Sequence, residues 1–290
     1  MADTIFSTII EAADVRDLLE SGAAPLIFDC RHELSDLQAG REAYLAGHLP
    51  GAHHLHLDED LSGPIRPGVT GRHPLPDMDN FARRMTALGL GPGTQVVVYD
   101  DKGGGIAARA WWMLRHLGHE AVAVLNGGIA AWTAAGGRLE AGDRPLPTAG
   151  TEIAGHLAPG GILGTRARAQ INRLRHDPEW TLVDSRTTPR YRGEAEPIDP
   201  VAGHIGGAIN LPWPDNLEDG KLRQPEALRA RFAPLDRGAD HTVFYCGSGV
   251  TACHNILAYT VAFGDIPLLY PGSWSDWITD PEAEVSTVVE

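Results

Sequence analysis

The feature that most constrains this chain is an internal repeat, because the same landmarks occur twice in the same order along its 290 residues. Each half contains an apolar run ending in Asp-x-Arg, a Gly-His segment ending in Gly-Ala, a second apolar run and a Gly-rich segment ending in Trp. Four residue pairs mark the repeat, at offsets of 155, 156, 146 and 145: Asp29 with Asp184, Gly47 with Gly203, Asp100 with Cys246 and Trp132 with Trp277. This regularity indicates a duplication with one deletion of about ten residues, and therefore two related domains.

The apolar runs, such as 26–29 and 243–245, have the length and composition of buried strands. Helical patterns such as 106–117 lie between them. Alternating strands and helices predict an α/β fold of two tandem domains, each a mainly parallel sheet flanked by helices. We expect an N-terminal domain at 1–140, a linker rich in Gly and Pro at 141–160 and a C-terminal domain at 161–290.

Composition narrows the class of function. The formal net charge of −14 argues against nucleic acid as a partner, since a binder must neutralise phosphates, and it means that an anionic substrate needs a local positive site. The three cysteines do not suggest a disulfide framework, and neither a secretory leader nor an apolar run of roughly 18 residues is present. We therefore expect a cytoplasmic protein that makes no use of a membrane. Because no coiled-coil heptad occurs, we expect a monomer.

The segment that begins at Cys246 carries the clearest chemical signal. A buried strand ends at this cysteine, a loop with Gly247 and Gly249 follows, and a helix begins near Val250. Such a junction lies at the carboxyl edge of a parallel sheet, where ligands bind in open α/β folds. The glycines allow successive N–H groups to point inward as an anion-binding nest, and the helix N-terminus adds positive charge. A thiol at this position is expected to be largely thiolate at neutral pH.

These motifs resemble those of the tandem-domain rhodanese family, which includes thiosulfate and 3-mercaptopyruvate sulfurtransferases. The resemblance covers nearly the whole chain and rests on Asp-x-Arg at 29–31, the Gly-His segments at 47–52 and 203–208, Cys-Gly-Ser-Gly-Val-Thr-Ala at 246–252 and Gly-Ser-Trp-Ser-Asp-Trp at 272–277. It implies two rhodanese-like domains, of which the first is catalytically inactive because Asp100 stands at the cysteine position. It also implies that Cys246 carries sulfur as a persulfide from a small anionic donor to a thiol acceptor such as thioredoxin, or to cyanide, without a cofactor.

The resemblance also assigns candidate site residues. Cys246, Ser248 and His73 are the expected catalytic residues. The expected substrate-binding residues are Arg190, Gly247, Gly249, Val250 and Thr251. Thiosulfate-specific members carry two basic side chains directly after the cysteine, whereas this chain has the neutral Gly-Ser pair of the mercaptopyruvate type. We therefore expect 3-mercaptopyruvate as the preferred donor and thiosulfate as the alternative.

One departure from the family pattern concerns the substrate carboxylate. Mercaptopyruvate-type members often carry a second arginine shortly before the Gly-His segment, where this chain has Ile198. We expect carboxylate binding either to be weaker or to be supplied from the first domain, by Arg72 or another cation. The acidic member of the family's relay with His73 aligns loosely with Glu59, and Arg186 is expected to bind Asp184 in a structural role.

Several other interpretations compete with sulfur transfer. A thiolate phosphatase is disfavoured because Ala252 stands where its loop needs an arginine. Alternation places His54 and His56 on one strand face as a possible metal pair, but no further ligand pattern supports it, and we expect no metal. Residues 103–105 are interpreted as a vestigial copy of the Cys246 loop rather than a phosphate loop. Cys253 is either a packing residue, which we favour, or a resolving thiol. A non-catalytic persulfide carrier or sensor remains the alternative from a different functional class.

Overall fold

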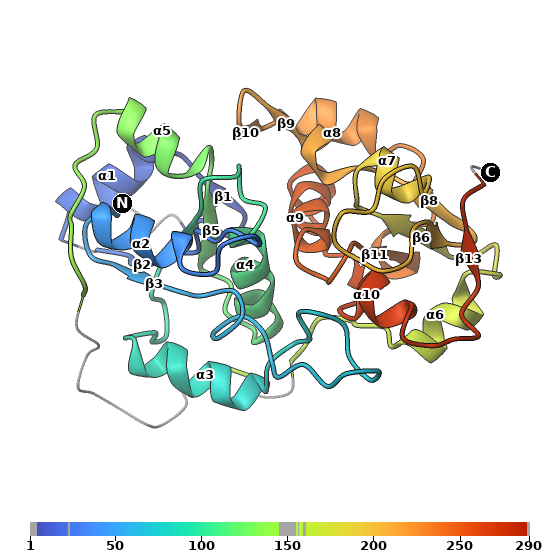
Figure 1. The fold of residues 1–290 in the computed structure, drawn as a ribbon. Helices are drawn as coiled ribbons and strands as arrows, with labels where there is room; N and C mark the ends of the chain where they lie inside the picture. The colour runs from blue at the N-terminus through green and yellow to red at the C-terminus, as the bar shows by residue number, and fades with distance from the viewer. Residues whose placement is uncertain (1–4, 23, 145–154, 156, 159–160, 289–290) are drawn as a thin grey trace. The chain divides into compact units, whose positions relative to one another are not determined.

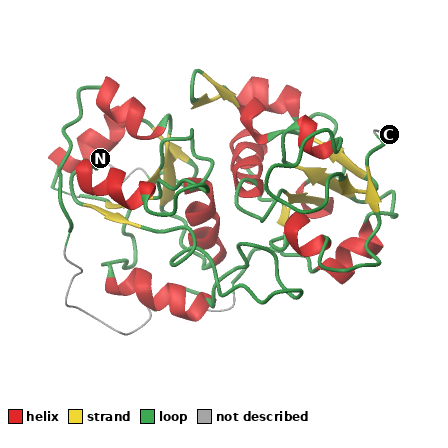
Figure 2. Cartoon of the chain, viewed as in Figure 1, coloured by secondary structure: helices red, strands yellow, loops and turns green. Residues whose placement is uncertain are grey.

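The computed structural model describes residues 5–22, 24–144, 155, 157–158 and 161–288. The chain divides into two compact units. Unit 1 comprises Met1–Ser62 and Pro76–Ile162, and unit 2 comprises Gly63–Leu75 and Leu163–Glu290. Within each unit, strands and helices alternate along the chain (Figure 2).

Unit 1 is built on a parallel five-stranded sheet with helices packed around it (Figure 1). The strands run in the order β1 (Ile9–Ile10), β5 (Val122–Leu125), β4 (Val96–Tyr99), β2 (Leu26–Asp29) and β3 (Ala52–His54). The helices are α1 (Ala12–Glu20), α2 (Ala39–Ala46), α3 (Met78–Ala87), α4 (Ala107–His116) and α5 (Gly128–Ala134). Every residue of β4 and β5 is buried, as expected for apolar strands covered on both faces.

Unit 2 repeats this plan with a parallel four-stranded sheet. Its order is β12 (Leu268–Leu269), β11 (Thr242–Tyr245), β6 (Thr181–Asp184) and β8 (Ala208–Asn210). The helices are α6 (Arg168–Leu174), α7 (Thr188–Tyr191), α8 (Pro225–Arg231), α9 (Ala252–Phe263) and α10 (Ser273–Trp277), with 3₁₀ turns at Trp213–Asn216 and Ala239–His241. Two short antiparallel pairs join β9 (Leu217–Glu218) to β10 (Lys221–Leu222) and β7 (His204–Ile205) to β13 (Val285–Ser286).

The two sheets confirm the predicted α/β fold. The order β5–β4–β2–β3 in unit 1 corresponds to β12–β11–β6–β8 in unit 2. An isolated parallel bridge between Thr165 and Leu269 stands where β1 pairs with β5. Each unit also has its own hydrophobic core, which includes Trp132 in the first and both Trp274 and Trp277 in the second.

A buried ion pair at the same sheet edge reinforces the repeat. Arg31 binds the Asp29 carboxylate and donates to the Gly47 carbonyl at 2.6 Å. Arg186 does the same with Asp184 and the Gly203 carbonyl at 2.7 Å. Each arginine thus ties a strand end to the Gly-His segment, which explains why both motifs recur together. Such pairs fix local geometry more reliably than they add stability.

The unit boundaries differ from the predicted domains in two places. Segment 63–75, expected in the N-terminal domain, belongs to unit 2, because Gly71 packs against the Gly272 carbonyl and the Arg72 N–H donates to Ser275. The predicted linker at 141–160 lies largely outside the described residues. Its described parts belong to unit 1, as shown by backbone bonds from Gly142 to Leu45 and from Ala158 to Leu117.

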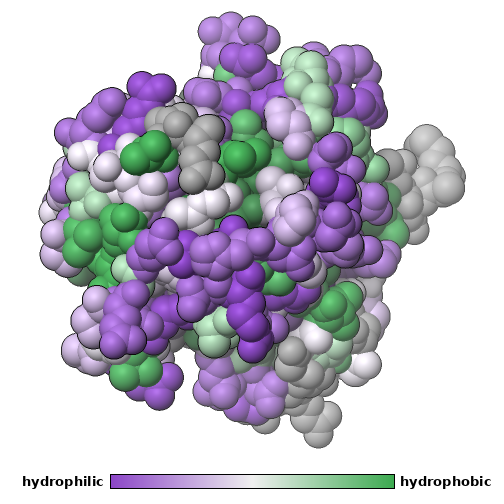
Figure 3. All heavy atoms as spheres, turned by 90° about the vertical axis from the view of Figure 1, so that its right-hand side faces the viewer, coloured by the Kyte–Doolittle hydropathy of each residue, from purple (hydrophilic) through white to green (hydrophobic). Residues whose placement is uncertain are grey.

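The surface that Figure 3 shows is largely polar, as the formal net charge of −14 leads one to expect. Figure 3 shows one face of the molecule, on which hydrophilic residues predominate and hydrophobic ones form small, separate groups. Among the helices of the described residues, none combines the length and the apolar character that a membrane crossing requires.

Candidate active site

Cys246 stands directly after β11, at the carboxyl edge of the unit 2 sheet, and its side chain is buried. The loop that follows it leads into α9, which begins at Ala252. This is the strand–loop–helix junction that the sequence predicts. The residues that gather around the thiol come from this loop, from α7 and its following segment, from the α10 start and from segment 63–75.

Two hydrogen bonds fix the position of Cys246. Its Sγ accepts the Gly249 N–H at 3.2 Å, and its own N–H donates to Ser273 Oγ at 3.1 Å. Gly249 has a φ of +79°, and a Cβ on this residue would collide with the Pro271 carbonyl. Only glycine therefore allows the backbone at position 249 to place its N–H against the sulfur.

The remaining loop N–H groups are available to an anion. Within the part of unit 2 that the structure describes, the N–H groups of Gly247, Ser248, Val250 and Thr251 make no hydrogen bond. Val250 is buried, and Thr251 immediately precedes α9. A second sulfur attached to Cys246 Sγ would therefore find donors of the kind that stabilise a developing anion.

The corresponding loop of unit 1 holds an anion of its own. The Asp100 carboxylate accepts the N–H groups of Lys102, Gly104, Ile106 and Ala107 at 2.8 to 2.9 Å. The predicted vestigial loop at 103–105 is thus a filled anion nest. A carboxylate in unit 1 and a thiol in unit 2 occupy the same place in the repeat.

Ser248 and His73 form a buried pair beside the cysteine. His73 Nδ1 lies 2.7 Å from Ser248 Oγ, although 175 residues separate them in the sequence. The two residues meet because segment 63–75, which contains His73, belongs to unit 2 together with Ser248. Glu59, the residue aligned with the acidic member of the relay, lies in unit 1, where it lines a cavity of about 410 Å³. Its place in a relay stays a prediction.

Two arginines converge on the start of the loop. A Cβ built on Gly247 would lie 3.0 Å from Arg72 Nη2 and 3.4 Å from each terminal nitrogen of Arg190. Burial is the main cause that lowers the pKa of Arg72, and the neighbouring Arg190 lowers it further, while Cys246 acts in the opposite direction. Arg72 therefore places a second cation beside the loop, and this cation comes from unit 2 rather than from the first domain. Its role in binding the donor carboxylate stays a prediction.

Sequence reasoning missed the acidic partners of these arginines. Glu196 accepts from Arg190 Nε and Nη2, and it also contacts Arg186 at 3.3 Å. Asp199 accepts from Arg72 Nη1 and from Arg190 Nη2. Ile198, which lies between them in the sequence, is 43% exposed. Acidic residues three apart in a Pro-containing loop were a signal, but the sequence shows no helix or strand that would position them.

The other cysteines differ from Cys246 in their surroundings. Cys253 lies buried in the first turn of α9, where its Sγ donates to the Gly249 carbonyl at 3.3 Å. Cys30 is buried in unit 1, and burial raises the pKa of its thiol, with the Asp29 charge adding to the effect. None of these three described cysteines forms a disulfide.

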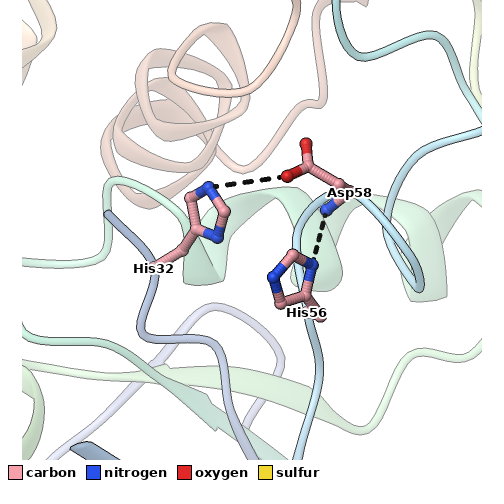
Figure 4. Close-up of side chains that lie close together, drawn as sticks. All are labelled: His32, His56 and Asp58. Atoms are coloured by element: carbon pink, nitrogen blue, oxygen red, sulfur yellow. Dashed lines mark hydrogen bonds and ion pairs between the residues drawn. The ribbon is translucent and has the colours of Figure 1, made fainter. Parts of the chain in front are cut away.

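The histidines of unit 1 group differently from the predicted pair of His54 and His56. The side chains of His32, His56 and Asp58 point toward one another (Figure 4), and one potential ligand atom from each lies within 4.8 Å of the others. Both ring nitrogens of His56 already have partners, the Leu37 carbonyl and the Asp58 N–H. His54 instead contacts the Arg31 carbonyl. The expected absence of a metal stays a prediction.

The duplicated α/β fold, with one loop built around a thiol, defines the class to which the chain belongs. The model of the rhodanese-like domain matches residues 11–135 and 167–280, so the chain belongs to the rhodanese-like family. The chain is 49% identical to a probable 3-mercaptopyruvate sulfurtransferase of Pseudomonas aeruginosa, over 90% of this chain and 92% of that protein. It is 39% identical to a putative thiosulfate sulfurtransferase of Mycobacterium tuberculosis, over 96% of both chains.

Solved structures agree with these relatives. A 3-mercaptopyruvate sulfurtransferase from Leishmania major superposes with a TM-score of 0.78 at 33% identity, covering 93% of this chain and 73% of that one. The enzyme SseA of Escherichia coli gives 0.77 at 30% identity, covering 93% of this chain and all of that one. Sulfurtransferase is accordingly the enzyme class of this chain.

Proposed function

We propose that this sulfurtransferase moves sulfur from 3-mercaptopyruvate to a thiol acceptor through a persulfide on Cys246. The observation that carries the choice of donor is the 2.7 Å contact between Ser248 and His73 beside the cysteine. When 3-mercaptopyruvate loses its sulfur, the carbon that it leaves needs a proton. Sulfite, which leaves from thiosulfate, needs none. A buried proton relay next to the thiol therefore favours 3-mercaptopyruvate.

The first half-reaction follows from this arrangement. The Cys246 thiolate attacks the thiol sulfur of the donor, an S–S bond forms, and the carbon–sulfur bond breaks with its electron pair moving into the pyruvate enolate. Ser248 and His73 take the proton of the donor thiol and deliver it to the enolate carbon, giving pyruvate. Arg190 would bind the donor carboxylate, because a planar guanidinium matches a carboxylate in geometry and charge.

The second half-reaction uses the loop. The free N–H groups of Ser248 and Val250 would stabilise the terminal sulfur of the persulfide, as the Asp100 carboxylate is stabilised in unit 1. An acceptor thiolate then attacks that sulfur and carries it away as its own persulfide, and the Cys246 thiolate returns. A thioredoxin-type protein is the acceptor that we propose, since a reduced thiol is what the chemistry requires. Such acceptors, together with three cysteines that form no disulfide in the described structure, support a reducing compartment such as the cytoplasm.

Thiosulfate is the second candidate donor because of the relative from Mycobacterium tuberculosis, which is named a putative thiosulfate sulfurtransferase. Gly247 and Ser248 contribute no positive charge to hold a dianion. The same persulfide would form with either donor.

Steady-state kinetics with both donors tests the proposal. We expect a higher kcat/KM for 3-mercaptopyruvate than for thiosulfate, and no turnover of either donor by Cys246→Ser. Ser248→Ala should reduce kcat with 3-mercaptopyruvate about a hundredfold, the usual contribution of proton transfer, and change thiosulfate turnover far less. Cys253→Ser, which removes a thiol in the next helix, is the matched control. An equal loss with both donors in Ser248→Ala would refute the relay, and the absence of turnover with any acceptor would favour a non-catalytic persulfide carrier.

A further inference from the structure

We propose that Arg72, Arg190 and Asp199 form one carboxylate-binding subsite, in which Asp199 makes the enzyme select a monoanionic sulfur donor over a dianionic one. The inference rests on the proposed function, because it assigns the source of donor selectivity at the same site. The resemblance supplies the role of Arg190, and the sequence suggests Arg72 as a substitute cation, whereas the role of Asp199 is new.

The two guanidinium groups are directed to one point. Arg72 comes from segment 63–75 and Arg190 from α7, yet both reach within van der Waals distance of a Cβ placed on Gly247. That position is one residue beyond the reactive thiol. A donor whose sulfur contacts Cys246 would therefore place its acidic group between the two arginines.

Asp199 bridges these two arginines. One carboxylate oxygen accepts from Arg72 and the other accepts from Arg190 at 3.1 Å. The Asp199 side chain is only 3% exposed, whereas those of Arg72 and Arg190 are 28% and 16% exposed. Asp199 thus holds both cations in place, while part of each arginine side chain stays exposed to solvent.

The subsite is balanced in charge. Arg186 is paired with Asp184, and Glu196 lies between Arg186 and Arg190. Three arginines therefore face three carboxylates: Arg72, Arg186 and Arg190 against Asp184, Glu196 and Asp199.

This balance determines which donor is tolerated. A monocarboxylate can form hydrogen bonds with both guanidinium groups and adds a single negative charge beside the thiolate. A dianion such as thiosulfate adds two charges to a site without surplus positive charge, and the partly buried position weakens screening by water. Removal of the Asp199 charge would leave a net charge of +1, which benefits a dianion more than a monoanion.

The test compares Asp199→Asn with wild-type enzyme, with both donors assayed in parallel. Asparagine keeps the size of the side chain but removes its charge. We expect the ratio of kcat/KM for thiosulfate to kcat/KM for 3-mercaptopyruvate to rise about tenfold, the effect of one nearby charge in a partly screened site. Asp199→Glu, which keeps the charge, should leave the ratio within about twofold of wild type.

Glu194→Gln is the matched control. Glu194 lies in the same loop and its removal changes the net charge equally, but its carboxylate is exposed and pairs only loosely with Arg192, at 3.8 Å. We expect this variant to leave the donor ratio unchanged. An equal change of the donor ratio in Glu194→Gln and Asp199→Asn would overturn the proposal, because the change would then result from the net charge of the protein and not from the position of Asp199.

Arg72→Gln keeps the proposal testable even if Asp199→Asn does not fold. Loss of the Arg72 guanidinium should raise KM for 3-mercaptopyruvate about tenfold and change kcat much less, since Arg72 binds the donor without taking part in bond breaking. An unchanged KM would overturn the role of Arg72. These outcomes differ from failure of the proposed function, in which the wild-type enzyme itself would turn over neither donor.

Discussion

Ser273 shows how a single residue shapes the thiol loop. It is one of two non-glycine residues with positive φ among those described, at 56°, and its Oγ accepts the Cys246 N–H while donating to the Tyr270 carbonyl. Gly128 holds the equivalent place in unit 1 with a φ of 57°, where a Cβ would collide with the Asp100 carbonyl. Unit 2 thus has a strained backbone at Ser273, and the serine provides the hydroxyl that accepts the Cys246 N–H.

Two substitutions separate the backbone strain from the hydrogen bond. Ser273→Ala keeps the strain and removes the hydroxyl, so the free energy of unfolding should fall by about 1 to 3 kcal/mol, the cost of an unsatisfied buried N–H. Ser273→Gly also loses the hydroxyl but relieves the strain, and it should be more stable than the alanine variant by about 1 kcal/mol. Urea denaturation of both variants measures the difference. Equal stability of the alanine and glycine variants would show that the backbone at Ser273 is not strained. Wild-type stability in both variants would show that the Ser273 hydrogen bond does not contribute.

At the scale of elements, the loops after β4 and β11 share one backbone arrangement but surround different side chains. In unit 1 the loop closes around a carboxylate that fills its N–H groups, and in unit 2 it closes around a thiol and leaves several N–H groups open. The N–H groups of the first loop are therefore occupied, whereas those of the second stay open for the persulfide that we propose on Cys246.

The stability of unit 1 should depend on Asp100. Asp100→Ala leaves four N–H groups without their acceptor, so it should lower the free energy of unfolding by about 3 kcal/mol or more. Asp101→Asn is the control. Asp101 is exposed at the next position, although surrounding protein partly desolvates its carboxyl, and this desolvation together with the Asp100 charge raises its pKa. Its neutralisation should therefore be neutral or slightly stabilising, and calorimetry of both variants checks the contrast. A loss in Asp101→Asn as large as that in Asp100→Ala would contradict the assignment.

At the scale of the whole molecule, buried histidines set the response to acid. Burial, together with the Arg144 charge, lowers the pKa of His53 to about 4, and burial also lowers the pKa values of His32 and His54. The unfolded chain takes up protons at these histidines near pH 6.5, but the folded chain does not until lower pH. Stability is therefore fully present above pH 6.5 and declines as the pH falls toward 4.

His53→Gln should flatten this decline. At pH 4 the His53 contribution amounts to at most about 3 kcal/mol, from 1.36 kcal/mol for each pKa unit. Urea denaturation of wild type and variant at pH 7.5 and pH 5 measures it. His176→Gln, at an exposed position, is the control and should retain the wild-type slope. An unaltered slope in His53→Gln would show that His53 is protonated in the folded state.

Most of the fold could be predicted from the sequence because it depends on local patterns that occur twice. The strands 26–29 and 243–245, the duplication and the Gly-containing loop after Cys246 are all visible in single segments. The position of segment 63–75 was not, because it has no periodic pattern and is held by contacts with residues about 200 positions away. Its membership in unit 2 is what brings Arg72 and His73 to the cysteine.

The acidic partners of the site arginines could not be predicted from the sequence either. Asp199 and Glu196 lie in a loop whose path follows from tertiary contacts, so their pairing with arginines could not be inferred from spacing. The resemblance to the family indicates only that an arginine is missing at Ile198, whereas the neighbouring Glu196 and Asp199 balance the charge of Arg190.

The most direct test of sulfur transfer through Cys246 is the intact mass of the protein after brief exposure to 3-mercaptopyruvate, followed by peptide mapping. We predict a gain of about 32 Da, one sulfur atom, on the peptide that contains Cys246 and on no peptide with Cys30 or Cys253. The added mass should disappear when a reduced thiol acceptor is supplied. A sulfur adduct on another cysteine, or none at all while pyruvate is still released, would contradict the central role of Cys246.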